Sequence, residues 1–233
     1  MTTPRLDIRH AIRSCVQDLE PEDLVLVACS GGADSVALAL ASADESRASG
    51  RRFGALVVDH RLQEDSAEVA RIAAATCSDA GLAPVEVLTV SVPAGPGVGG
   101  PEAAAREVRR AALLDAAQRL GASAVLLAHT RDDQAETVLL RLARGSGARS
   151  LSGMAMVDGM WRRPLLGLTR DLVRASLDGV ETWNDPQNAD PRFARVRVRT
   201  EVLPAMTGAL GGDVVDGLSR TARLLRDDAD ALD

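Results

Sequence analysis

The sequence predicts an α/β fold: a doubly wound, mostly parallel sheet with helices on both faces and a short helical extension at its C-terminal end. Three observations predict it. Short apolar runs alternate with helical patterns through the first 145 residues, as in parallel sheets covered on both faces. The 233 residues are 46% hydrophobic, which is enough for a sizeable core. Small and polar residues directly follow several apolar runs, where ligands bind in such sheets.

Each element follows from hydrophobic periodicity and from its start and stop signals. Strands are expected at 24–29, 53–59, 84–90 and 123–129. Helices around these strands are expected at 5–19, 34–44, 64–80, 101–120 and 132–143. Beyond Thr169, which can cap a helix, further helices are expected at 171–178, 192–206 and 213–231.

Composition excludes several function classes. All 27 basic residues are arginine, and without lysine the chain has no Walker A loop and no protein-kinase or Schiff-base chemistry. The cysteines Cys15, Cys29 and Cys77 are far apart in the sequence and form no CxxC pair. They indicate neither a disulfide scaffold nor a zinc site, and they fit a reducing cytoplasm. No apolar run reaches 18 residues and the N-terminus is polar, so we expect no membrane span and no signal peptide.

Charge is unevenly distributed along the chain. The net charge is −6, but residues 141–200 carry 11 arginines against 6 acids, whereas residues 1–140 and 201–233 are both acidic. The basic middle block is where an RNA backbone would bind. The alternative is a solvated charged surface, and salt-sensitive binding would favour RNA.

The most specific signal lies at 30–35, where an apolar run leads into Ser-Gly-Gly-Ala-Asp-Ser and then a helical pattern. Such a turn directs backbone N–H groups and a helix dipole at one point, which suits phosphate. Gly31 and Gly32 permit positive φ and close approach. Asp34 would repel phosphate unless a cation bridged them, so we expect it to bind Mg²⁺. The alternative is an ordinary turn in which Asp34 or Ser35 caps the helix.

A second polar group, at 129–137, follows the fourth expected strand and opens a helix. Asp132 and Glu136 are four residues apart and share a helix face. Carboxylates at this edge could hold Mg²⁺, or orient an amine nucleophile and accept its proton. Alternatively, Asp132 and Asp133 only complement the helix dipole. His129 could contact phosphate or substrate, although a lone histidine is more often structural.

The turn at 30–35 resembles the pyrophosphate loop (PP-loop) of N-type ATP pyrophosphatases, which adenylate a substrate and release pyrophosphate. Further motifs, in order through residues 24–206, resemble signatures of tRNA(Ile)-lysidine synthases. They are Val-Asp-His-Arg-Leu (58–62), Glu-Ala-Ala-Ala-Arg-Glu (102–107), Ala-His-Thr-Arg-Asp-Asp-Gln-Ala-Glu-Thr (128–137), Arg-Gly-Ser-Gly (144–147), Arg-Pro-Leu-Leu (163–166) and Asp-Pro-Gln-Asn-Ala-Asp-Pro-Arg-Phe (185–193). The Asp-Asp-Gln-Ala-Glu-Thr run followed by Arg-Gly-Ser-Gly is the most specific of them.

The resemblance implies a PP-loop domain with an adenine nucleotide alpha hydrolase-like fold over 1–205, and the start of a helical extension over 206–233. It implies a cytoplasmic ligase that uses ATP and Mg²⁺ to join free L-lysine to C2 of the wobble cytidine of tRNA(Ile) with a CAU anticodon. The reaction would pass through an adenylated cytidine and release pyrophosphate and AMP. The oligomeric state stays open, a homodimer included.

The resemblance also assigns residues to these ligands. The implied ATP-binding residues are Ser30, Gly31, Gly32, Ala33, Asp34, Ser35, Asp59, His60 and His129, with Asp34 as the metal ligand. The implied catalytic residues are Asp34, Arg106, Asp132, Asp133 and Glu136, and the base that deprotonates lysine would be Asp132 or Asp133. The implied tRNA-binding residues are Arg144, Arg149, Arg195, Arg197 and Arg199.

The chain departs from the family pattern in three ways. Thr130 stands where a second histidine is common, and Val196 stands where asparagine is common, which puts an asparagine hydrogen bond in doubt. Most members also extend further, so we expect either a short form or a truncated chain.

Three alternatives remain. A tRNA-thiolating enzyme of the same superfamily would commonly need paired cysteines. A non-catalytic nucleotide sensor would leave Asp34 and the carboxylates at 132–136 without a role. A ligase acting on a small molecule would not need the arginine-rich middle block, which favours tRNA.

Overall fold

The computed structural model describes residues 3–59, 61, 65–91, 100–145 and 147–232. Within these residues, six strands form one sheet in the order β3-β2-β1-β4-β6-β5. Their bounds are β1 Leu24–Ala28, β2 Arg52–Asp59, β3 Val85–Thr89, β4 Ala122–Leu126, β5 Val157–Asp158 and β6 Trp161–Arg162. All neighbouring strands are parallel except β5 and β6. The chain adds β2 and β3 on one side of β1 and then crosses back to add β4 on the other, so the prediction of a doubly wound sheet is confirmed.

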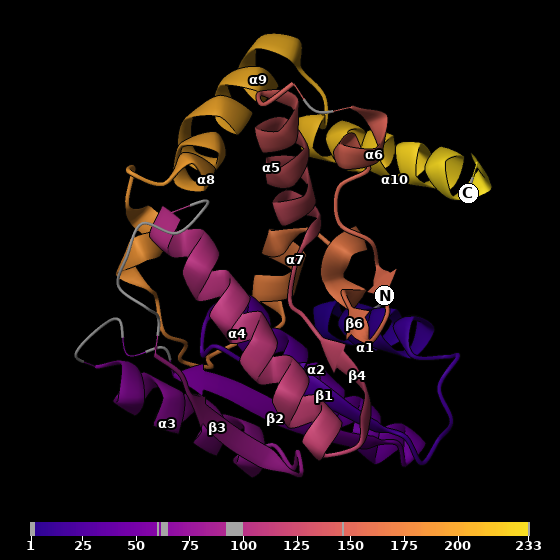
Figure 1. The fold of residues 1–233 in the computed structure, drawn as a ribbon, viewed down its shortest axis with the longest axis vertical. Helices are drawn as coiled ribbons and strands as arrows, with labels where there is room; N and C mark the ends of the chain where they lie inside the picture. The colour runs from indigo at the N-terminus through magenta and orange to yellow at the C-terminus, as the bar shows by residue number, and fades with distance from the viewer. Residues whose placement is uncertain (1–2, 60, 62–64, 92–99, 146, 233) are drawn as a thin grey trace.

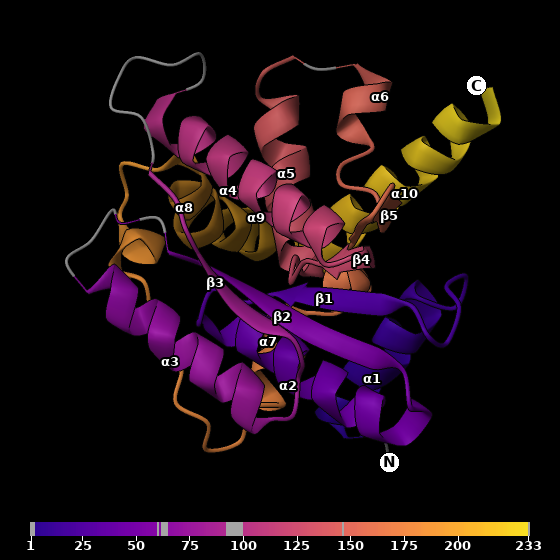
Figure 2. The same ribbon diagram turned by 60° about the horizontal axis from the view of Figure 1, so that its bottom comes forward.

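Helices cover both faces of this sheet (Figures 1 and 2). Their bounds are α1 Pro4–Cys15, α2 Ala33–Ser49, α3 Ser66–Asp79, α4 Gly100–Arg119, α5 Arg131–Leu142, α6 Ala148–Leu151, α7 Arg170–Ala175, α8 Ala194–Arg197, α9 Leu203–Leu210 and α10 Val214–Leu232. In Figure 2, α1, α2, α3 and α7 lie below the sheet and α4 lies above it. Helices α5, α8, α9 and α10 form a further layer on the side of α4.

Alternation along the strands divides the core between the two faces. Val25 and Val27 of β1 pack with residues of α1, α2 and α3, whereas Leu24 and Leu26 pack with Leu113 and other residues of α4. This follows from the two-residue period of a strand, which sends successive side chains to opposite faces. Both sets are buried, as expected for a parallel sheet covered on both sides.

A separate apolar cluster joins α10 to α5. Ala135 and Leu139 of α5 pack with Val215 and Leu218 of α10 and with Leu203 at the start of α9. The C-terminal segment is therefore helical, as predicted, and it docks on the helix that follows β4.

Several element boundaries differ from the predicted ones. α1 ends at Cys15 instead of residue 19, because Val16 leaves the helical conformation and caps it. α2 continues to Ser49 instead of residue 44 and ends where Gly50 adopts a left-handed conformation with φ 73°. β4 ends at Leu126 instead of residue 129, because its partner β6 is only two residues long.

The C-terminal half differs more. The hairpin of β5 and β6 and the short helix α6 carry too few residues for a periodic signal, and the sequence did not predict them. The helix expected at 192–206 is a continuous path of three pieces, in which the π-helical turn η3 (Val198–Val202) separates α8 from α9. Pro204 lies in the first turn of α9 and lacks the N–H of a regular helix, which accounts for the break. Among the described residues, no helix has the length and apolar composition of a membrane span.

Candidate functional site

A cavity of about 1020 Å³ opens at the carboxyl ends of the central strands. Its lining includes the turn after β1, Asp59 at the end of β2, and His129 beyond β4. These strands flank the point where the strand order reverses, which is where doubly wound sheets bind ligands. The fold therefore brings the turn at 30–35, Asp59 and His129 to one edge of the sheet, while His60 lies outside the described residues.

The turn at 30–35 is built around Gly31 and Ser35. Gly31 has φ +81°, a conformation that residues with a Cβ rarely adopt. The Ser35 hydroxyl accepts the Ser30 N–H at 3.1 Å and donates to the Gly32 carbonyl at 2.8 Å. Gly32 is the N-cap of α2, without a side-chain cap. The alternative in which Asp34 or Ser35 is the N-cap is therefore wrong. The Ser35 N–H donates to the Gly32 carbonyl at 3.0 Å, so the N–H groups of Ala33 and Asp34 are the ones that suit an anion at this helix start.

A later segment covers this turn. The Trp183 N–H donates to the Gly31 carbonyl at 3.0 Å. A Cβ at Gly31 would lie 3.5 Å from Val69 and Ala73 of α3. The turn is thus enclosed by the α3 side and by the segment after α7, and Trp183 lines the same cavity.

Asp34 lies in the first turn of α2 beside two arginines. Its Oδ1 atom is buried without a hydrogen-bond partner and lies 3.6 Å from Arg174 Nε, while Oδ2 lies 3.9 Å from Arg170 Nε. Burial raises the pKa of the Asp34 carboxyl, and the two guanidinium groups oppose that shift. A buried carboxylate oxygen without a hydrogen bond, next to a phosphate-binding turn, suits a Mg²⁺ ion that also binds phosphate oxygens.

The start of α5 is fixed by a capping box. Thr130 Oγ1 accepts the Asp133 N–H at 3.4 Å, and Asp133 Oδ2 accepts the Thr130 N–H at 2.8 Å. Such reciprocal bonds stabilise a helix start. Asp133 therefore has a structural role that the sequence analysis did not name, and it also lines the cavity.

Arg170, at the start of α7, joins the carboxylates. Its Nη2 lies 3.0 Å from Asp133 Oδ1 and 3.1 Å from Glu136 Oε1, and its backbone N–H donates to Asp132 Oδ2 at 2.8 Å. Although burial opposes ionisation, Arg170 and the Thr130 hydrogen bonds hold the pKa of the Asp133 carboxyl below its ordinary value. With Asp34 at 3.9 Å, one guanidinium thus links the PP-loop turn to α5.

Glu136 is fully buried and is contacted by arginines from three segments. Arg199 donates to both of its oxygens at 2.7 and 3.1 Å, Arg170 donates at 3.1 Å, and Arg195 Nε lies 3.8 Å away. Both carboxylate oxygens of Glu136 are therefore occupied by guanidinium groups. Arg195 and Arg199 were predicted to bind tRNA, but in the structure their guanidinium groups point toward the buried Glu136 carboxylate.

The remaining predicted residues are spread more widely. Arg106 lines the cavity together with further arginines from α4 and from the segment after β6, namely Arg109, Arg110 and Arg163. Arg197 is exposed and donates to the carbonyls of Pro191 and Arg192 at 2.6 and 3.0 Å. Arg144 and Arg149 are exposed near α6, outside the lining of this cavity.

His129 lines the cavity, and its Nδ1 is buried without a hydrogen-bond partner. Burial lowers the pKa of His129 to about 3. Its imidazole is therefore neutral at physiological pH. The unpaired Nδ1 can donate or accept one hydrogen bond with a ligand, depending on the tautomer.

Two of the three cysteines meet in the core although they are far apart in the sequence. The hydrogen bond between Cys29 and Cys77 lowers the pKa of Cys29 to about 7 and raises that of Cys77. All three cysteines are free and buried. Among the described residues, no group of three or more histidine, cysteine or acidic side chains is placed to hold a metal ion.

Sequence reasoning missed Arg170, Arg174 and Trp183. Arg170 follows the Thr169 N-cap of α7, whose side chain accepts the Leu172 N–H. That capping signal was visible, but in a chain whose cations are all arginine nothing separates a central arginine from a surface one. Trp183 belongs to an irregular segment without a periodic pattern.

Comparison with known proteins agrees with this geometry. A family model described as a PP-loop domain matches residues 4–206. The tRNA(Ile)-lysidine synthase of Thermobifida fusca is 55% identical, and the alignment covers 97% of this chain and 69% of that protein. The tRNA(Ile)-lysidine synthase of Salinispora arenicola is 52% identical, with 100% and 71% covered.

A solved structure shares the fold. The U34-tRNA thiolase NcsA from Methanococcus maripaludis, with its [4Fe-4S] cluster, superimposes with a TM-score of 0.75 at 16% identity, covering 94% of this chain and 79% of that one. At this identity the likeness concerns the fold alone. The family match and the identities to curated relatives carry the assignment: the chain belongs to the tRNA(Ile)-lysidine synthase family of PP-loop enzymes.

Proposed function

We propose that this chain joins lysine to the wobble cytidine of a tRNA(Ile) with a CAU anticodon, at the expense of ATP. One observation carries the proposal. A single cavity is lined by the PP-loop turn, by Asp133 of the carboxylate cluster at the start of α5, and by arginines of α4. The names of the relatives support the same activity.

The PP-loop turn suits the triphosphate of ATP. Backbone N–H groups at the start of α2 and the helix dipole would hold its phosphates. Asp34 would hold Mg²⁺ through its unpaired Oδ1, and the ion would neutralise phosphate charge. Arg174, 3.6 Å from the same oxygen, is placed to contact a phosphate when the ion binds Asp34.

In the first step, the C2 oxygen of cytidine attacks the α-phosphorus of ATP. The bond between that phosphorus and the bridging oxygen breaks, and pyrophosphate leaves. Negative charge accumulates on phosphate oxygens, which positively charged donors stabilise. Arg106 and Arg163 on the cavity wall and the neutral His129 are available to supply such hydrogen bonds.

In the second step, the ε-amine of lysine attacks C2 of the adenylated cytidine, and AMP leaves with the former C2 oxygen. The amine must first lose a proton. Of the two candidate bases, Asp133 lines the cavity and Asp132 does not. Because Arg170 holds the pKa of Asp133 low, this carboxylate is better suited to hold the lysine ammonium than to keep its proton. The nearby guanidinium groups of Arg106 and Arg195 lower the pKa of such an ammonium and favour its neutral form.

The test is ATP-dependent incorporation of labelled lysine into unmodified tRNA(Ile) with the CAU anticodon, with pyrophosphate measured alongside. Lysine incorporation with equimolar pyrophosphate is the expected result. Pyrophosphate without lysine would contradict the lysine assignment and indicate another acceptor. ATP binding without either product would favour the nucleotide sensor, and sulfur transfer to the tRNA would favour a thiolase.

A further inference from the structure

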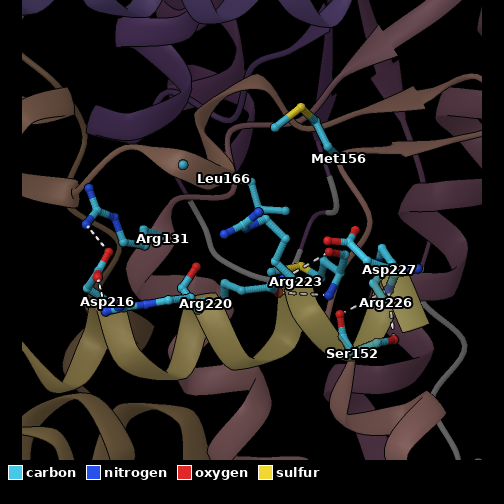
Figure 3. Close-up of a pocket in the computed structure, with 13 residues that line it drawn as sticks. Arg131, Ser152, Met156, Leu166, Asp216, Arg220, Arg223, Arg226 and Asp227 are labelled. Atoms are coloured by element: carbon cyan, nitrogen blue, oxygen red, sulfur yellow. Dashed lines mark hydrogen bonds and ion pairs between the residues drawn. The ribbon is translucent and has the colours of Figure 1, made fainter. Parts of the chain in front are cut away.

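A second cavity, of about 510 Å³, lies between α10, α5 and the segment 152–167 (Figure 3). We call the larger cavity at the carboxyl ends of the strands, which contains the PP-loop turn, the nucleotide cavity. Both cavities are lined by residues of α5, but on different sides of that helix. Arg131 and Gln134 line the second cavity, whereas Asp133 lines the first. We call it the α10 cavity, because three arginines of that helix, Arg220, Arg223 and Arg226, line it.

The cations of the α10 cavity outnumber its anions. Four arginines line it, Arg131 and the three of α10, against the two acids Asp216 and Asp227. Asp216 already forms ion pairs with two of the arginines, at 2.9 Å from Arg131 and 2.7 Å from Arg220. The lining residues therefore carry an excess of two positive charges, and no carboxylate is within ion-pair distance of Arg223 or Arg226 among the described residues.

Donors in this cavity lack acceptors. Arg226 Nη2 donates only to neutral oxygens, those of Ser152 at 3.1 Å and of Gly153 at 2.8 Å, so its charge is not compensated. The Nε atoms of Arg131 and Arg226 are buried without a hydrogen-bond partner. Arg223 is exposed and makes no ion pair or hydrogen bond to any residue that the structure describes. Guanidinium groups with unused N–H donors suit the oxygens of phosphate.

The shape of the cavity favours a chain of phosphates over a small ion. Arg220, Arg223 and Arg226 follow one another at three-residue intervals, which spreads them over about 9 Å of the helix axis. Figure 3 shows them along α10, with Met156 across the cavity. Met156 is 46% exposed and offers an apolar surface to a ribose or base.

We propose that the α10 cavity binds backbone phosphates of the substrate RNA, next to the nucleotide whose base enters the nucleotide cavity. The proposal rests on the proposed function, which supplies the RNA. Arg131 and Asp133 are two residues apart on α5, so the two cavities lie on different sides of one helix, close enough for neighbouring nucleotides of one RNA strand to reach both. Arg223 is the residue whose charge is most available to it.

The test measures the affinity of unmodified tRNA(Ile) transcript for wild type, Arg223→Gln and Arg223→Glu at several salt concentrations, with lysidine formation followed in the same preparations. Arg52→Gln is the matched control. Arg52 is exposed at the first position of β2, at the end of that strand away from Asp59, and it has no partner among the described residues. We expect Arg223→Gln to weaken binding several-fold and to reduce the slope of log K against log salt by about 0.7–0.9, the effect of one lost phosphate contact. Arg223→Glu should weaken binding further, and Arg52→Gln should match wild type.

Each other outcome is decisive. Unchanged affinity and salt slope for both Arg223 variants, in an enzyme that forms lysidine, would overturn the α10 cavity and leave the proposed function intact. A wild type that neither binds nor modifies tRNA(Ile) would overturn both. If Arg223→Gln loses affinity for inorganic phosphate by calorimetry and keeps its affinity for tRNA, the cavity is a small-anion site and the RNA proposal is wrong.

Discussion

The two cavities beside α5 differ in how closely their arginines are paired with carboxylates. In the nucleotide cavity, Arg170 and Arg199 meet the carboxylates of Asp133 and Glu136 at hydrogen-bond distance. In the α10 cavity, Arg226 meets neutral oxygens and Arg223 has no described partner. Paired arginines hold a site in shape, while unpaired ones remain free to bind an anion. The number of arginines in a segment therefore says little about its partner until the carboxylates around them are known.

The same contrast changes the meaning of the charge distribution. Residues 141–200 hold the largest excess of arginine, yet Arg162 is bound to Asp18, Arg163 donates to the Ala155 carbonyl and Arg199 binds Glu136. Residues 201–233 are acidic overall, but all three of their arginines line the α10 cavity. Local net charge therefore does not show which arginines are paired: Arg220 is bound to Asp216, whereas Arg226 in the same acidic segment donates only to neutral oxygens.

Breaking the paired cluster should have the largest effect. Glu136→Gln removes the carboxylate that Arg199 contacts at 2.7 and 3.1 Å and one of the two that contact Arg170 Nη2, inside a buried cluster. We expect a loss of about 3–5 kcal/mol in the free energy of unfolding, measured by urea denaturation. In the control Glu68→Gln, an exposed pair with Arg71 is lost, and the cost should stay below about 1 kcal/mol. Equal losses in the two variants would show that the buried cluster contributes no more to the free energy of unfolding than an exposed ion pair.

Asp34→Asn should have the next largest effect, on chemistry. It keeps the shape of the side chain and removes the charge that would hold Mg²⁺. We expect pyrophosphate release to fall by at least about 100-fold, with little change in stability because Oδ1 has no hydrogen bond to lose. Retained turnover would remove Asp34 from the metal role.

The neutral imidazole of His129 should make stability depend on pH. The pKa is about 3 in the folded chain and about 6.5 when unfolded, so the unfolded chain binds more protons between these values. The contribution is complete above pH 6.5 and is lost as the pH falls toward 3, by about 1.4 kcal/mol per unit. Between pH 7 and pH 5, wild type should lose about 2 kcal/mol more than His129→Asn in parallel urea titrations. Parallel losses would mean that the His129 imidazole is protonated as easily in the folded chain as in the unfolded one.

The smallest expected effect is that of Arg197→Ala. Arg197 is exposed and holds the carbonyls of Pro191 and Arg192, so its removal should cost about 1 kcal/mol or less. If it also contacts tRNA, as predicted from the sequence, the KM for tRNA should rise. Unchanged kinetics at physiological salt would restrict Arg197 to shaping its loop.

The sheet and the PP-loop were predictable because each depends on local pattern. β1, β2 and β3 begin and end within one residue of their predicted bounds, since buried parallel strands are continuous apolar runs between turns. The turn at 30–35 was predictable for the same reason: a strand, two glycines and a helix start must lie together in the sequence. Short pieces held by tertiary contacts, such as β6 and α6, carry no such pattern.

The pairing within the site was less predictable. Asp132, Asp133 and Glu136 were found from their spacing, but their common partner Arg170 is 34 residues beyond Glu136. Burial decides that Arg199 turns inward to Glu136, and burial is a property of the packed layers rather than of the Arg-Val-Arg-Val-Arg motif. The contact between Cys29 and Cys77 was hidden for the same reason.

The most direct test of the division between the two cavities is steady-state lysidine formation over a range of tRNA(Ile) concentrations, with wild type, Asp34→Asn and Arg223→Gln side by side. Asp34→Asn should lower the maximal rate by a larger factor than it changes the half-saturating tRNA concentration. Arg223→Gln should raise the half-saturating concentration by a larger factor than it lowers the maximal rate. If both variants change the same parameter to the same extent, the separation into a chemical cavity and an RNA-binding cavity is contradicted.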